Sequence, residues 1–133
     1  MALDIGIGSG IRDPGIQYKL EFWADGYYFF LFGYFERANL SRSHELLDLY
    51  GDSEIGGVQL DRLEEELIRA KADVTDKEDT WDELIGWSGI ERKESQEVRE
   101  KVERERMLIL IKKLLALVSE ARERQMKIIG LGD

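Results

Sequence analysis

The stretch MLILIKKLLALVSEARERQMKIIGL, residues 107–131, decides the fold. Its apolar residues recur every three or four positions, which predicts an amphipathic helix of about four turns. The residues that share the apolar face are Met107, Leu110, Ile111, Leu114, Leu117, Val118 and Ala121. Arg122 and Arg124 suit the negative pole at the helix end. The apolar run over residues 127–131 then predicts a short closing strand.

Two further helices are expected upstream. Residues 60–74 carry apolar residues at steps of three and four, which predicts one apolar stripe on a helix. The stripe consists of Leu60, Leu63, Leu67, Ala70 and Val74. Acidic residues are concentrated in the first turns, where the positive pole of a helix favours them. Residues 27–39 are apolar on every side, which favours a buried helix. The alternative is the second strand of a hairpin that turns at Asp25 and Gly26, because aromatic residues also favour strands.

The remaining patterns predict strands. Residues 16–23 alternate between apolar and polar side chains, as a half-buried strand does, and a turn follows at residues 24–26. Residues 80–88 predict a strand, and Val98 and Val102 lie on its expected partner beyond a charged turn at residues 91–95. The segment 41–57 is loop-like, with one short strand expected at residues 46–50.

Together these elements predict an α+β fold, in which a small, mostly antiparallel sheet packs against two or three helices and the last helix is long and amphipathic. One domain is expected over residues 16–133. Residues 1–15 hold four glycines and the single proline, Pro14. This composition predicts a flexible lead-in outside the domain.

The charge of the chain is uneven. The 133 residues carry a net charge of -9. Residues 41–90 hold 14 acids and five bases, whereas residues 91–133 hold nine acids and 11 bases. The acidic balance argues against binding to a phosphate backbone. The acidic middle third is either a solvated face or a docking surface for a basic partner.

Motifs for catalysis or cofactor binding are not apparent, so we expect neither an enzyme nor a cofactor. The glycines at residues 6–10 precede a strand rather than a helix, unlike a phosphate-binding loop. The chain has no cysteine and one histidine, His44, which excludes thiolate and multi-histidine metal sites. Neither acidic cluster, around Asp48 or Asp76, fits the spacing of a calcium loop. No secretion signal or membrane span is apparent, so we expect a cytoplasmic protein.

Two stretches carry a resemblance. The first is DLYGDSEIGGVQL, residues 48–60, which runs into an amphipathic helix, and the second is the final helix with the ending KIIGLGD. Together they resemble small bacterial immunity proteins of polymorphic toxin systems, including contact-dependent growth inhibition. The resemblance implies a small non-enzymatic protein that occludes the active site or substrate surface of a cognate toxin, often a basic nuclease.

The expected partner-binding residues combine acids of the middle third with aromatic anchors, a composition typical of binding hot spots. They are Asp48, Tyr50, Asp52, Glu54, Asp61, Glu64, Glu65, Trp81 and Asp82. Two alternatives remain open. One is a structural or regulatory module that dimerises through the last helix, and the other is an acidic mimic of nucleic acid. The sequence leaves the oligomeric state undetermined.

Overall fold

The computed structural model describes residues 3–22, 24–38, 52–88 and 96–132. In chain order the elements are β1 (Leu3–Gly8), β2 (Gln17–Phe22), α1 (Asp25–Ala38), β3 (Asp52–Ile55), α2 (Val58–Thr75), β4 (Thr80–Ser88), β5 (Gln96–Glu103), α3 (Arg104–Glu123) and β6 (Lys127–Gly132). The strands form one four-stranded antiparallel sheet, in the order β2-β1-β6-β3, and a separate β4–β5 hairpin. The predicted α+β class is confirmed.

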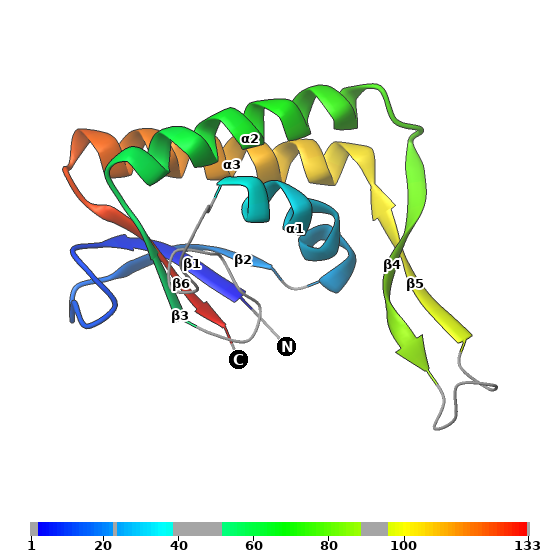
Figure 1. The fold of residues 1–133 in the computed structure, drawn as a ribbon, viewed down its shortest axis with the longest axis horizontal. Coiled ribbons are helices and arrows are strands. Elements are labelled where there is room, and N and C mark those ends of the chain that lie inside the picture. Colours follow the sequence, from blue (N-terminus) through cyan, green and yellow to red (C-terminus); the bar gives the residue numbers. More distant parts are fainter. Residues whose placement is uncertain (1–2, 23, 39–51, 89–95, 133) are drawn as a thin grey trace.

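The helices α2 and α3 run antiparallel above the four-stranded sheet, and α1 lies below them, between the sheet and the hairpin (Figure 1). The predicted stripe of α2 is confirmed, since all five of its residues are buried. The stripe of α3 is also buried, except that Leu110 is only partly covered. Each apolar stripe faces the common core, where its burial stabilises the fold.

Helix is the correct alternative for the aromatic segment, which forms α1. The helix begins at Asp25, so the turn predicted at residues 24–26 is largely wrong: Asp25 and Gly26 form the first helical turn. Phe22 at the end of β2 packs edge-to-face on Tyr28 and Phe35, at centroid distances of 6.0 and 6.3 Å. The helix is apolar on several sides because sheet, α2 and hairpin all contact it.

The glycine-rich start is not a lead-in outside the domain, because β1 is an inner strand of the four-stranded sheet. Leu3, Ile5 and Ile7 are at most 1% exposed. A Cβ at Gly6 would lie 2.5 Å from the backbone oxygen of Gln17, next to a bulge in the β1–β2 pairing. Glycine is required here for the close approach of two backbones rather than for flexibility.

The strands predicted at residues 16–23, 80–88 and 127–131, and around Val98 and Val102, are confirmed as β2, β4, β6 and β5. Strand β3 lies within the segment that was predicted to be loop-like, where it pairs with β6. The strand expected at residues 46–50 and the turn expected at residues 91–95 lie outside the described residues.

Candidate protein-binding surface on the β-hairpin arm

The acids at the start of α2 are compensated within the chain. Arg122 of α3 donates to Asp61 at 2.8 Å and to Glu64 at 3.1 Å. The hydrogen bond to Glu64, followed by that to Asp61, raises the pKa of Arg122. Of the three α2 acids expected in the partner surface, only Glu65, which is exposed, forms no ion pair with a described residue.

The acids of β3 lie at another place. Glu54 accepts a hydrogen bond from the backbone N–H of Ile11 at 2.8 Å and forms an ion pair with Lys127 at 3.1 Å. It therefore fastens the loop between β1 and β2 to the edge of the sheet. Asp52 is exposed on the same strand. Burial, followed by the charges of Asp4 and Asp52, raises the pKa of Tyr18 on the opposite edge strand.

Trp81 is partly buried where the arm joins the body, which makes it a packing residue. Its ring lies 5.3 Å from that of Phe30 in α1, and the ammonium of Lys77 lies 4.7 Å from its centroid. The indole Nε1 donates to Glu83 at 3.0 Å. Neighbouring Asp82 is exposed. Trp81, which was expected to anchor a partner, therefore packs against other residues of its own chain.

The predicted partner residues therefore do not form one patch. An α-helix of 18 residues spans about 27 Å, so α2 separates the acids near its start from the hairpin beyond its end, as Figure 1 shows. Asp48 and Tyr50 lie outside the described residues, as does His44.

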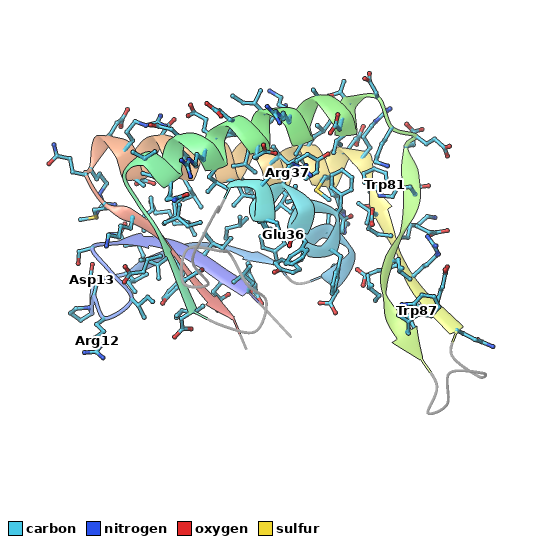
Figure 2. All side chains as sticks on the ribbon, viewed as in Figure 1. Arg12, Asp13, Glu36, Arg37, Trp81 and Trp87 are labelled. Atoms are coloured by element: carbon cyan, nitrogen blue, oxygen red, sulfur yellow. The ribbon has the colours of Figure 1, made fainter. Side chains whose placement is uncertain are left out.

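The surface that remains for a partner is the β4–β5 arm, defined as strands β4 and β5, which extends away from the four-stranded sheet (Figures 1 and 2). Trp87 lies toward its outer end and is 63% exposed, the second-largest value among the exposed large apolar side chains of the described residues. Large aromatic side chains dominate the energetics of protein interfaces when a partner buries them.

A β-bulge gives Trp87 its orientation. In the register, Leu84 pairs with Arg99 and Gly86 with Val98, so Ile85 is the extra residue. Directly paired residues share a face of the ribbon, and faces alternate along β5. Trp81 therefore shares a face with Val102, whereas Trp87 shares the opposite face with Glu97. Because Trp81 and Trp87 are six positions apart, a regular strand would carry both indoles on one face, and the bulge reverses this.

The arm is acidic, with five acids and two bases among its described residues. Glu83 and Glu100 are directly paired across the strands, and neither forms an ion pair with a described residue. Like charges in this arrangement repel each other. A cation contributed by a partner would relieve the repulsion.

The base of the arm is held firmly to the body. Val102 is fully buried, and a Cβ at Gly26 of α1 would lie 3.0 Å from its side chain. The hydroxyl of Tyr27 accepts a hydrogen bond from the backbone N–H of Glu103, and Arg104 donates to Asp79 and to the carbonyl of Lys77. These contacts fix the position of the strands that carry Trp87 outward.

The predicted partner set omits Glu83, Glu100 and Trp87, of which Trp87 is the most exposed. The sequence signal that could have identified Trp87 is its position near the hairpin end, where residues have fewer neighbours to bury them.

The apolar stripe of α3 is covered by the chain itself, which leaves that stripe little surface for the dimer considered above. Three metal-ligating side chains do not gather anywhere in the described part of the chain.

None of the helices in the described ranges is long and apolar enough to cross a bilayer. Comparisons of the chain with protein-family models, with curated proteins and with solved structures gave no match.

Proposed function

We propose that this chain is an immunity-type binding protein that neutralises a basic protein toxin, of the nuclease kind, in the cytoplasm. The observation that carries the proposal is the exposed indole of Trp87 on a projecting, acidic arm. A narrow two-stranded ribbon has the shape to enter the substrate cleft of another protein. Occupation of that cleft would block the toxin without any chemistry by this chain.

The proposed interface has two complementary parts. The indole of Trp87 would fill an apolar pocket, where a buried tryptophan contributes strongly to affinity. Lys or Arg side chains on the opposite wall of the toxin cleft would approach Glu83 and Glu100, which lie on the face of the ribbon opposite to Trp87, and would form charge-assisted hydrogen bonds with them. A nuclease cleft suits this arrangement because it carries cations for the phosphate backbone. The acidic arm would also accelerate encounter at low salt.

The first test removes the anchor. Trp87→Ala should weaken binding to the basic toxin encoded beside this chain by about 30-fold or more, since hot-spot aromatic residues contribute at least 2 kcal/mol. Tyr18→Ala removes an exposed aromatic residue on β2, far from the arm, and should leave the affinity within about twofold. Calorimetric titration measures both, and toxin activity in the same mixtures measures neutralisation.

Three outcomes would overturn this proposal: a neighbouring gene product that does not bind, equal losses for the two variants, or an affinity that does not fall as salt rises.

The second test separates a binding role from a structural one. Glu83→Gln keeps an acceptor for the indole of Trp81 but removes the repulsion from Glu100. The free protein should therefore unfold at the same or a higher temperature, whereas toxin binding should weaken and lose part of its salt dependence. Glu36→Gln, at an exposed acid of α1, is the matched control and should change neither quantity. A Glu83→Gln variant that is less stable but binds normally would refute the role of this pair.

A further inference from the structure

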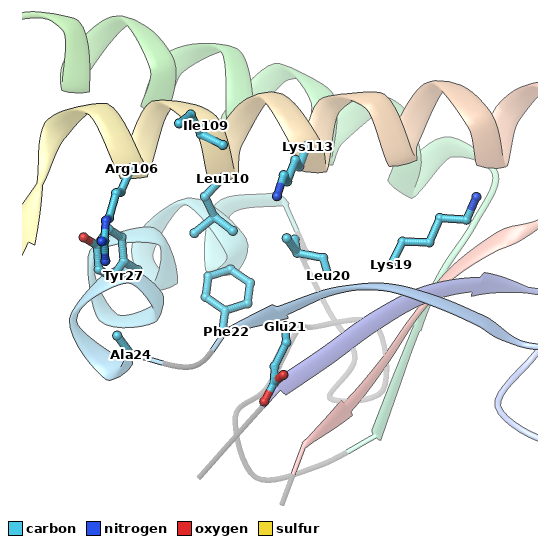
Figure 3. A pocket seen from close by; sticks show the side chains of 10 residues that line it. All are labelled: Lys19, Leu20, Glu21, Phe22, Ala24, Tyr27, Arg106, Ile109, Leu110 and Lys113. Carbon is cyan, nitrogen blue, oxygen red and sulfur yellow. The ribbon is translucent and has the colours of Figure 1, made fainter.

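A groove of about 360 Å³ lies between the edge strand β2 and helix α3 (Figure 3). Its floor is apolar and includes Leu20, Phe22 and Leu110, and Tyr27 of α1 closes one end. The volume lies within the range of small-molecule binding sites, which combine apolar walls with a few polar groups. We name it the β2–α3 groove.

Three cations line this groove in a protein whose net charge is -9. Arg106 and Lys113 project from the same side of α3, and Lys19 comes from β2 (Figure 3). Lys19 is bound to Glu120 at 3.0 Å, and Arg106 to Glu103 at 2.8 Å. Lys113 forms no ion pair with any described residue, and it lies near the middle of the groove.

The acid that lines the groove does not compensate Lys113. The carboxylate of Glu21 points away from α3, toward the far side of β2 (Figure 3). The groove therefore offers an ammonium group beside an apolar floor, and Ile109 extends the apolar wall with 54% of its surface exposed. An anion attached to an aliphatic chain complements both properties at once, because the chain leaves water while the charge is paired.

We propose that the β2–α3 groove binds a linear aliphatic carboxylate, with its carboxylate on Lys113 and its chain along Leu20, Phe22 and Leu110. The acidic remainder of the surface repels anions, so this basic site with an apolar floor is where such a ligand would concentrate. The site shares no residue with the β4–β5 arm. Its test is therefore independent of the proposed toxin binding.

The first experiment varies the head group at constant chain length. Octanoate, octan-1-ol and octylammonium are titrated into the full chain, and amide chemical shifts locate the binding. Octanoate should bind most tightly, with shift changes at Leu20, Phe22 and Leu110, and decanoate should bind about tenfold more tightly than octanoate because each methylene adds apolar contact. Equal binding of octan-1-ol, stronger binding of octylammonium or shift changes elsewhere would overturn the proposal.

The second experiment uses matched variants. Lys113→Gln should weaken octanoate binding about tenfold and leave octan-1-ol binding unchanged, whereas Lys112→Gln, at the exposed neighbouring residue outside the groove, should preserve both. Ile109→Glu should weaken octanoate and favour octylammonium. Ile68→Glu is its control, since Ile68 on α2 is equally exposed at 55%. Equal effects of the Lys113 and Lys112 variants would contradict the assignment.

Discussion

At the scale of single residues, some acids that the sequence suggests are free to bind a partner instead accept hydrogen bonds within the chain. Asp13 is an example: one carboxylate oxygen accepts the backbone N–H of Ser9 and the other that of Gly15, each at 2.8 Å. The hydrogen bond from Ser9, followed by that from Gly15, lowers the pKa of Asp13 below its ordinary value. Asp13 therefore shapes the connection between the two adjacent strands β1 and β2.

The lowered pKa predicts a pH-dependent effect of removing Asp13. A carboxyl group whose folded pKa is depressed stabilises the fold above its unfolded pKa, about 3.8, and loses this effect as pH falls through the folded value. Asp13→Ala should therefore lower the unfolding temperature at pH 7, and its difference from the unchanged protein should shrink below pH 3.8. Thermal unfolding between pH 2.5 and 7 measures this, with Glu36→Ala as a surface control. A difference that stays constant down to pH 2.5 would show that the carboxylate charge is irrelevant.

At the scale of elements, the packing of neighbouring elements determines whether a glycine is required at a given position. Gly26 and Gly33 both lie in α1, and the sequence does not distinguish them. A Cβ at Gly26 would meet Val102 at 3.0 Å and Glu100 at 3.3 Å, so this glycine allows β5 to approach the helix. A Cβ at Gly33 would meet only the guanidinium of Arg37 at 3.7 Å, which is ordinary contact.

This contrast predicts opposite outcomes for one substitution. Gly33→Ala should raise the free energy of unfolding by about 1 kcal/mol, because alanine favours a helix interior over glycine. Gly26→Ala should give no such gain and should loosen the base of the arm, since β5 must shift to admit the methyl group. Chemical denaturation measures the stabilities, and the amide of Glu103, which donates to Tyr27, reports on the arm. Equal stabilisation by both variants would contradict the close packing of α1 on β5.

At the scale of the whole molecule, the acidic middle third and the basic last third meet. Because α2 and α3 run antiparallel, Arg122 reaches Asp61 and Glu64, while Arg104 reaches Asp79 near the other end. The charge asymmetry of the sequence is thus partly neutralised inside the fold. The arm retains an acidic excess, which is why we place the partner surface there rather than along α2.

The order of the four-stranded sheet predicts the result of a truncation. Removal of residues 1–9 would leave β2 without its partner β1 and would uncover one side of β6. The truncated chain should lose the dispersed amide spectrum and cooperative unfolding of the full chain. Removal of Asp133, beyond the last strand, is the control. A stable, folded chain without residues 1–9 would contradict the central position of β1.

The sequence by itself determined the elements whose periodicity is strong. The α2 and α3 stripes and the strands β2, β4, β5 and β6 could be predicted because helix and strand periods are local properties of the chain. Strand β1 was missed, although Leu3, Ile5 and Ile7 alternate, because glycines suggested flexibility. Gly6 is required by the close approach of the β2 backbone, a neighbour that no local pattern contains.

Only the tertiary structure decided which charges and rings remain available. Asp61 and Glu64 were predicted as partner residues, yet Arg122, about 60 positions away in the chain, pairs with both. Trp81 and Trp87 look equivalent in the sequence, but α1 covers one and a single extra residue at Ile85 turns the other to the opposite face. Pairing and burial depend on contacts between distant segments, so the sequence supplies the candidate residues and the fold selects among them.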